Sequence, residues 1–432
     1  MSVVPFEYNI EKYLEATEVI DFHNEMIRRL ADTLFLCSAN ELEFIKNTYE
    51  YVRDRISHSA DIHEDLITCS ASEVLEAGHG ICFAKSHLLA ALLRCKGIPA
   101  GFCYQKLILD DESAPELIYH GLNGVYIKEL NQWIRLDARG NKEAVNAQFS
   151  LETEQLAFPI RPEKGEEDNL VVYPYPDRNV LKSMKSSKTR TNLWENLPKK
   201  LSVKVLLWDI DGTVLDFLAA EKAAIKNCFE ICGLGECTDE MISRYSKINR
   251  KYWERLERGE MTKPEILVGR FEEFFESEGI VTNCAKEFNK EYQIRLGDTI
   301  CFHDDAYELL KDLKGRIKQY AVTNGTKVAQ DRKLKLSGLI DIFDGIFISE
   351  ELGVEKPGMG FFEKVWEKIG KYSSDEVMII GDSLTSDMQG GNNAGILCCW
   401  YNPNHLENTK NVRIDYEIDH LWQLEEILKK HA

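Results

Sequence analysis

The chain has 432 residues, too many for one ordinary domain and enough for two or three. Apolar residues make up 44% of it and charged residues 29%, a balance that excludes a disordered or fibrous protein. The net charge of −19 argues against a nucleic-acid polymer or an anionic membrane as main partner, because both repel acidic proteins.

Targeting and redox signals predict a cytoplasmic protein. The first residues include several acids and lack the apolar region of a signal peptide, and no apolar run reaches the roughly 18 residues of a membrane span. The twelve cysteines form no CxxC pair, so we interpret them as reduced thiols and not as a disulfide framework.

The N-terminal half has the pattern of an α+β domain. Helical spacing of apolar residues covers residues 11–56, and a second helix is predicted over residues 83–96, where Gly97 and Pro99 end it. Three strand-like segments follow, with the sequences GFCYQKLIL, HGLNGVYI and QWIRLDA.

Three residues of this half are candidates for thiol chemistry. Cys82 falls in the first turn of the predicted helix, where the positive end of the helix dipole favours a thiolate. His120 begins the segment HGLNGVYI, and Asp137 closes QWIRLDA. A cysteine, a histidine and an orienting acid are the components of an acyl-transfer triad. Such a trio can be drawn from most chains, so the residue types alone decide nothing.

The sequence context of these residues resembles the transglutaminase-like, papain-like superfamily over roughly residues 40–145. The resemblance implies that Cys82 is the nucleophile, His120 the base and Asp137 the acid that orients it, with a peptide or amide as substrate. This family usually has a tryptophan two residues after the histidine, whereas Gly121 and Leu122 follow it here. The alternative is a non-catalytic module that binds a peptide or a partner.

A change of composition divides the chain. Residues 186–200 are basic and rich in serine and threonine without a regular period, which predicts a linker between domains at 1–185 and 201–432. Short apolar strands then alternate with helices, which predicts a doubly wound α/β parallel sheet. A mostly helical insertion at about 218–298 separates the first two strands of this sheet.

Polar clusters follow the strands of the predicted sheet. Asp209 and Asp211 lie two positions apart on a tight turn with Gly212, an arrangement suited to attack on phosphorus by one carboxylate while the other handles a proton. A DxD pair alone is a weak signal, and three later features strengthen it. They are Thr323-Asn324-Gly325, Lys356, and Asp382 with Asp387, which offer phosphate donors, a neutralising cation and oxygen ligands for Mg²⁺.

These motifs, in this order, resemble the haloacid dehalogenase superfamily over residues 201–432. The resemblance implies that Asp209 forms an aspartyl-phosphate and that Asp211 acts as general acid and then base. It implies phosphate binding by Gly212, Thr323, Asn324, Gly325 and Lys356. It implies a magnesium site formed by Asp209, Asp382, Asp387 and the backbone carbonyl of Asp211. A second acid favours phosphoryl transfer over dehalogenation, since a halide leaves without a proton.

Further details, such as INRKYWERLERGEMTK, SEELGVEKP and GDSLTSDMQGGNNAG, resemble the pyrimidine 5′-nucleotidase group of this superfamily. The resemblance implies that the helical insertion is a C1-type cap and that the substrate is a nucleoside monophosphate such as UMP, dUMP or dTMP. Tyr252, Trp253 and Arg270 of the cap are candidates to contact the base, with a purely structural role as the alternative. The competing hypothesis for the whole chain is a cysteine peptidase, amidase or acyl transferase.

Overall fold

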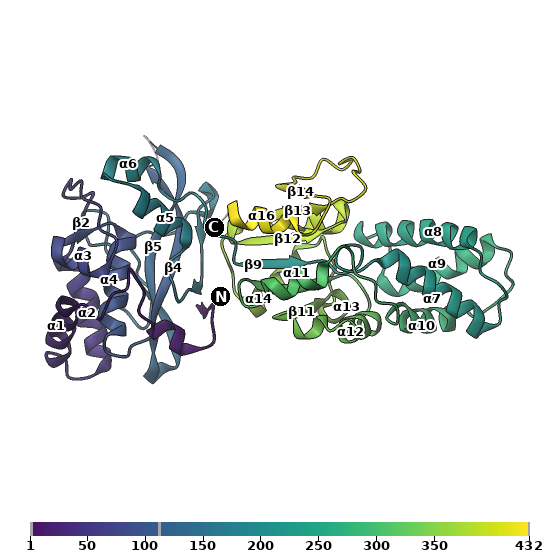
Figure 1. Cartoon of the computed structure of the whole chain (residues 1–432), viewed down its shortest axis with the longest axis horizontal. Coiled ribbons are helices and arrows are strands. Elements are labelled where there is room, and N and C mark those ends of the chain that lie inside the picture. The colour runs from purple at the N-terminus through teal and green to yellow at the C-terminus, as the bar shows by residue number, and fades with distance from the viewer. Residues whose placement is uncertain (1–2, 111–113, 431–432) are drawn as a thin grey trace. The chain divides into compact units, whose positions relative to one another are not determined.

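The computed structural model describes residues 3–110 and 114–430, and the chain divides into two compact units. One unit extends to Ser202 and includes the short segment Ile369–Ser373. The other contains Val203–Lys368 and the described residues from Ser374 to Lys430. Each unit has its own sheet and apolar core, so each is described by itself (Figure 1).

The N-terminal unit has an α+β fold built on a four-stranded antiparallel sheet in the order β6-β5-β4-β7. Helix α4 packs against the two long central strands of this sheet. The main elements are α1 Glu25–Leu36, α2 Glu41–Arg55, α3 Ala71–Ala77, α4 Cys82–Arg94, β4 Ala100–Asp110, β5 Ala114–Ile127, β6 Gln132–Leu136 and β7 Glu167–Asp168. The shorter ones are β1 Val4–Pro5, β2 Ser57–His58, β3 His79–Gly80, β8 Val171–Val172, α5 Arg178–Ser186 and α6 Arg190–Glu195.

The helix starts in this unit follow from local sequence. Asn24, Asn40 and Ser70 cap α1, α2 and α3, each side chain accepting a hydrogen bond from a backbone N–H of the first turn. Helix α4 has no side-chain cap and is buried from Phe83 to Arg94. Cys82, its first residue, is partly exposed.

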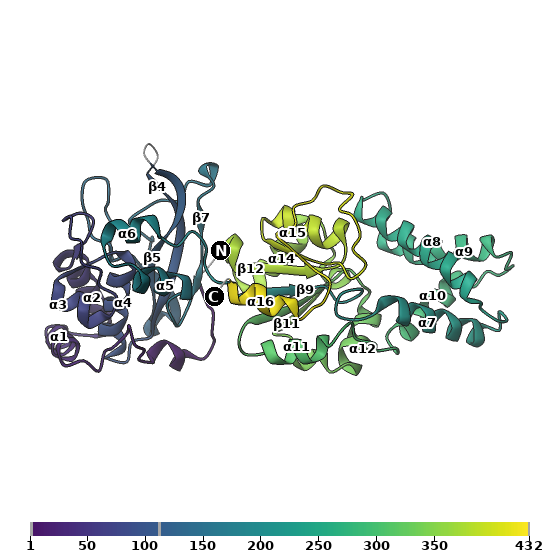
Figure 2. The same ribbon diagram turned by 45° about the horizontal axis from the view of Figure 1, so that its top comes forward.

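The C-terminal unit contains the predicted parallel sheet, with six strands in the order β11-β10-β9-β12-β13-β14. Helices lie on both faces of it, as crossover connections between parallel strands require (Figures 1 and 2). The strands are β9 Val205–Trp208, β10 Lys318–Thr323, β11 Gly345–Ile348, β12 Val377–Gly381, β13 Leu397–Tyr401 and β14 Tyr416–Ile418. The helices are α11 Ala306–Leu313, α12 Lys327–Leu336, α13 Ser349–Leu352, α14 Met359–Ile369, α15 Gln389–Ala394 and α16 Gln423–Lys430.

Four of the five helices between β9 and β10 form a helical cap, and they lie together beyond the ends of the strands in Figure 2. Their shared core is rich in aromatic rings, and the rings of Tyr245 and Phe271 stack with centroids 5.1 Å apart. The cap helices are α7 Phe217–Cys232, α8 Asp239–Glu257, α9 Lys263–Ser277 and α10 Ala285–Leu296.

The structure differs from the linker expected at residues 186–200. Helix α6 lies within this segment, and the side chain of Thr189 caps it by accepting a hydrogen bond from Asn192 N. Leu193 and Leu197 are buried, and the segment belongs to the N-terminal unit as far as Ser202. The composition of residues 186–200 predicted a linker, but two apolar side chains are enough to pack a polar segment against a core.

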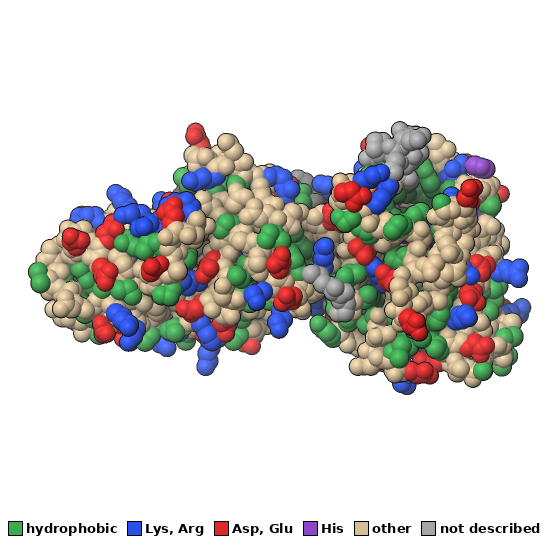
Figure 3. Space-filling view, turned by 180° about the vertical axis from the view of Figure 1, so that it is seen from behind, with side chains coloured by type: hydrophobic (Ala, Val, Ile, Leu, Met, Phe, Trp, Pro, Cys, Tyr) green, Lys and Arg blue, Asp and Glu red, His purple; other side chains and the backbone are tan. Residues whose placement is uncertain are grey.

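No helix within residues 3–110 and 114–430 has both the length and the apolar character needed to cross a membrane. On the face drawn in Figure 3, basic and acidic side chains are interspersed. A mixture of this kind produces no extended field of one sign on that face.

Candidate functional site

The turn that carries Asp209 follows β9 directly. The Asp209 N–H donates to the carbonyl oxygen of Ile380 at 2.9 Å, which ties the turn to strand β12. Gly212 has a φ of 101°, and a Cβ at this position would lie 2.7 Å from Asp382 Oδ2. Only glycine fits both the backbone and the space. The DxDGT sequence thus allows the first turn and Asp382 to lie against each other.

Lys356 joins two carboxylates at the centre of this site. Its buried ammonium group donates to Asp209 Oδ1 at 2.8 Å, to Asp387 Oδ1 at 2.6 Å and to the carbonyl oxygen of Val322 at 2.8 Å. Asn324 holds the backbone of Lys356 in place, because it donates to Lys356 O at 2.8 Å and accepts from Lys356 N at 2.9 Å. Four separate stretches of the chain therefore meet at one cation.

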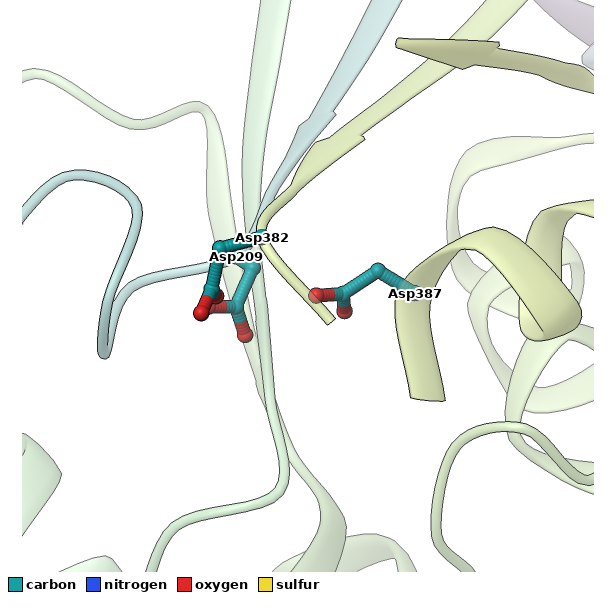
Figure 4. A group of neighbouring side chains, drawn as sticks. All are labelled: Asp209, Asp382 and Asp387. Atoms are coloured by element: carbon teal, nitrogen blue, oxygen red, sulfur yellow. The ribbon is translucent and has the colours of Figure 1, made fainter. Parts of the chain in front are cut away.

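Asp209, Asp382 and Asp387 form the candidate cation site (Figure 4). One carboxylate oxygen from each residue lies within 4.8 Å of the others. In Figure 4 the carboxylates of Asp209 and Asp382 lie side by side, and Asp387 points toward them from a separate helical turn. Three hard oxygen donors at this spacing suit a small divalent cation such as Mg²⁺.

Crowding makes these carboxylates costly to ionise together. Burial and the charge of Asp387 raise the pKa of Asp209 well above its ordinary value, against the opposing effect of Lys356. Desolvation of its carboxylate and the same neighbour raise the pKa of Asp382 to about 7, although the residue as a whole is exposed. A bound divalent cation would remove this repulsion, so the chemistry of the donor set fits Mg²⁺.

Hydroxyl groups complete the end of the sheet. Thr323 is buried at the end of β10, and its Oγ1 accepts a hydrogen bond from Gly325 N at 3.1 Å. Thr213 is also buried and donates to Asp382 Oδ1 at 3.2 Å. The predicted phosphate-binding residues Thr323, Asn324 and Gly325 thus lie beside Lys356, although the Asn324 side chain is occupied by the Lys356 backbone.

Asp211 lies apart from the three carboxylates. Its Oδ2 accepts a hydrogen bond from Gln330 Nε2 at 2.6 Å, and its Oδ1 accepts one from the ammonium group of Lys333. Both partners are on helix α12 and are buried. Gln330, Lys333 and Thr213 were not predicted as residues of the site. The available signal for the first two was a pair of long polar side chains one helical turn apart, soon after the Thr323 motif.

A cavity of about 350 Å³ opens between the Asp211 turn and the cap. This volume lies in the range typical of small-molecule sites, about 300–1,000 Å³. Its walls combine carboxylate, amide, guanidinium and aromatic groups from both sides. They include Asp211, Gly212, Glu221, Asn249, Arg250 and Trp253.

Of the three cap residues predicted to be candidates for base contact, Trp253 lines this cavity. Tyr252 packs into a small apolar cluster of the cap. Arg270 is buried within the cap and donates to Asn249 Oδ1 at 2.7 Å, and Asn249 in turn donates to Glu221 Oε1 at 2.8 Å. Arg270 therefore supports residues of the cavity wall.

In the N-terminal unit, Cys82, His120 and Asp137 meet although they come from α4, β5 and the end of β6. His120 Nε2 and Asp137 Oδ2 are 2.8 Å apart. Backbone N–H groups of Arg139 and Ala157 also donate to the Asp137 carboxylate, at 3.1 and 3.0 Å. His120 lies in the middle of its strand, not at the start as predicted, because pairing of β4 with β5 continues on both sides of it.

The pKa values of His120 and Asp137 depend on the side chains next to them. Burial disfavours a charged imidazole, but Asp137 and the neighbouring Cys82 outweigh it and raise the pKa of His120 to about 10. Burial also disfavours a charged Asp137, yet the His120 charge and the backbone donors lower its pKa. The acid thus orients and stabilises an imidazolium next to the thiol.

The thiol site opens into a cavity of about 780 Å³. Apolar and aromatic side chains form much of its wall, including Leu107, Ile118, Phe158 and Trp194. His58 also lines it, and within the described residues its buried Nδ1 has no hydrogen-bond partner. The cavity is large enough for a ligand of drug size.

Comparison with known proteins identifies the family. Residues 203–395 match the haloacid dehalogenase-like hydrolases, and residues 28–138 match the transglutaminase-like superfamily. The HAD-hydrolase YfnB of Bacillus subtilis (strain 168) is 36% identical over 225 residues, which cover 52% of this chain and 95% of YfnB. The chain belongs to the haloacid dehalogenase-like hydrolases. It combines such a hydrolase with a transglutaminase-like domain at the N-terminus.

Two further relatives of this haloacid dehalogenase-like hydrolase are named for an activity. The pyrimidine 5′-nucleotidase PynA of Streptococcus pneumoniae (strain ATCC BAA-255 / R6) is 37% identical over 53% of the chain and 96% of its own length. The pyrimidine 5′-nucleotidase YjjG of Escherichia coli (strain K12) is 31% identical over 45% of the chain and 85% of its own. The crystal structure of magnesium-bound YfnB covers 52% of this chain and 99% of YfnB, with a TM-score of 0.50.

Proposed function

We propose that the C-terminal unit hydrolyses phosphate monoesters through an aspartyl-phosphate on Asp209. The observation that carries the proposal is the position of the Lys356 ammonium, 2.8 Å from Asp209 and 2.6 Å from Asp387. Asp209 attacks phosphorus, the bond from phosphorus to the leaving oxygen breaks, and Asp211 gives its proton to that oxygen. Asp211 then accepts a proton from the water that hydrolyses the aspartyl-phosphate.

The residues that would hold Mg²⁺ are Asp209, Asp382 and Asp387, with the backbone carbonyl of Asp211. When bound, Mg²⁺ supplies positive charge that offsets the carboxylates and the transferring phosphoryl group. Lys356 and Thr323 orient the same phosphoryl oxygens, and the backbone N–H group of Asn324 is a further donor for them.

The substrate we propose is a pyrimidine nucleoside 5′-monophosphate. The activities named for PynA and YjjG support it. The 350 Å³ cavity supports this substrate as well. It extends from Asp211 to the Trp253 ring, the Glu221 carboxylate and the Arg250 guanidinium of the cap. Trp253 is suited to stack on a planar base, and Glu221 is suited to accept from a base N–H.

A substrate screen tests this function. UMP, dUMP and dTMP are expected to release phosphate faster than AMP, and EDTA should abolish the release until Mg²⁺ is added back. Asp209→Asn should lose at least about 10³-fold in kcat with an unchanged circular dichroism spectrum, because the covalent route needs the carboxylate. Turnover in Asp209→Asn close to that of the wild type would reject the nucleophile assignment.

We propose a second activity, acyl transfer by Cys82, because His120 and Asp137 lie 2.8 Å apart beside a cavity that also contains the thiol. His120 takes the thiol proton, the thiolate attacks an acyl carbonyl carbon, and the imidazolium returns a proton to the leaving group. A peptide or amide is the class of substrate that this chemistry serves.

Acylation by p-nitrophenyl acetate tests the second activity. We expect a burst of p-nitrophenol equal to one acyl group per chain, lost in Cys82→Ala and strongly slowed in His120→Ala. Mass spectrometry should locate the acetyl group on Cys82. A wild-type protein without a burst, whose Cys82 reacts with iodoacetamide no faster than its exposed Cys37, would favour a non-catalytic binding module.

A further inference from the structure

Helix α12 provides both hydrogen-bond donors that hold the Asp211 side chain. Gln330 Nε2 donates to Asp211 Oδ2 at 2.6 Å, and Lys333 donates to Asp211 Oδ1. Residues three apart on a helix share one face, so the two donors contact the carboxylate from the same side. Gln330 is fully buried and Lys333 is 1% exposed, which leaves neither side chain free to move into solvent.

The surroundings of the two donors are fitted to this contact. A Cβ on Gly325 would lie 2.2 Å from Gln330 Nε2, so the glutamine passes directly against a backbone that has no side chain there. The Lys333 ammonium lies 5.4 Å from the ring centroid of Phe217, a residue that lines the 350 Å³ cavity together with Asp211. Lys333 is therefore held between an aromatic ring and the carboxylate.

We propose that Lys333 and Gln330 are positioning residues for Asp211 in the phosphatase reaction, an inference that rests on the proposed function. A single carboxylate on a turn can rotate about its side-chain bonds, and proton transfer requires it within hydrogen-bond reach of the reacting oxygen. Two donors fix the plane of the carboxylate and leave its remaining lone pairs toward the cavity. From there Asp211 passes its proton to the leaving oxygen as the phosphorus–oxygen bond breaks.

Substrates that differ in their leaving group separate this role from a structural one. The 5′-oxygen of UMP needs a proton to leave, whereas p-nitrophenolate leaves without one. We expect Lys333→Met to lower kcat/KM for UMP by about 10²-fold, and that for p-nitrophenyl phosphate by less than about 3-fold. Lys333→Arg should recover part of the loss. Lys335→Met, a change on the exposed side of the same helix, should behave as the wild type.

A double-mutant cycle supplies the second readout. In an Asp211→Asn background, Lys333→Met should cause no further loss with UMP, because the group it positions is already gone. Equal losses with both substrates, or full additivity with Asp211→Asn, would overturn the positioning role. If Lys333→Met does not fold by circular dichroism, Gln330→Met carries the same comparison. A wild-type protein that hydrolyses neither substrate would instead reject the proposed phosphatase function, and the positioning role with it.

Discussion

Replacing Lys356 by methionine removes the one cation that contacts both Asp209 and Asp387 within the described residues. Methionine has nearly the same length, so the change removes charge and hydrogen bonds with little change in volume. Two buried carboxylates are then left facing each other without a cation. We expect both the stability of the C-terminal unit and its activity to fall.

The size of the effect follows from the distances. At 2.8 Å and an effective dielectric constant of about 20, Coulomb's law gives about 6 kcal/mol for one ion pair, before the cost of desolvation. Removing one partner of a buried pair typically costs about 3–5 kcal/mol of net stability. For a unit of this size, that corresponds to a decrease in Tm of roughly 10 °C. The phosphatase rate should fall about 10²–10³-fold, the usual cost of losing one preorganised charge in an active site.

Thermal unfolding followed by circular dichroism in EDTA measures the stability, and phosphate release from UMP in Mg²⁺ measures the rate. Lys335→Met is the matched control, because Lys335 is exposed. The loss of stability should be smaller at pH 5 than at pH 8. Burial already raises the pKa of Asp209, so without Lys356 the folded state binds a proton more tightly than the unfolded state and gains stability as pH falls.

Two results would refute this reasoning. A Tm for Lys356→Met within about 2 °C of that of Lys335→Met would mean that the two carboxylates do not depend on this cation. A destabilisation that grows as the pH is lowered from 8 to 5 would contradict the direction of the Asp209 pKa shift.

Gly212→Ala should lower kcat for UMP more than about 10²-fold while the circular dichroism spectrum is kept, because a Cβ would lie 2.7 Å from Asp382 at a φ of 101°. An active Gly212→Ala variant would contradict that geometry. Iodoacetamide labelling of Cys82 at pH 7 should be faster than that of the exposed Cys37, since the pKa of His120 is raised to about 10 and its imidazolium stabilises a thiolate. In His120→Ala this difference should be lost, and unchanged labelling there would reject the pairing. Expression of residues 203–432 alone should give a soluble phosphatase, and an insoluble product would contradict independent folding of the unit that begins after Ser202.

Elements with a strong local signal could be predicted from the amino-acid sequence. Continuous apolar runs predicted strands such as β9 and β12, which are buried along their whole length. The order of the motifs predicted that Asp209, Lys356 and Asp387 meet, since carboxyl ends of parallel strands share one edge of a sheet. The resemblance to the transglutaminase-like superfamily, and not the residue types alone, indicated Cys82, His120 and Asp137.

Short elements and those dependent on distant contacts could not be predicted in this way. Strand β14 has three residues, too few for a period, and forms by pairing with β13. Helix α6 forms in a polar stretch because Leu193 finds a core to pack against.

The donors that hold Asp211 can be identified only from the packing of the folded chain. The spacing of Gln330 and Lys333 by one helical turn is shared by other polar pairs of helix α12, so it does not single them out. Burial beside Asp211 makes them different, because a buried amide and a buried ammonium must find acceptors or pay a large desolvation cost. Whether a polar side chain is solvated or buried depends on how helices and strands pack, and that packing involves residues more than a hundred positions apart.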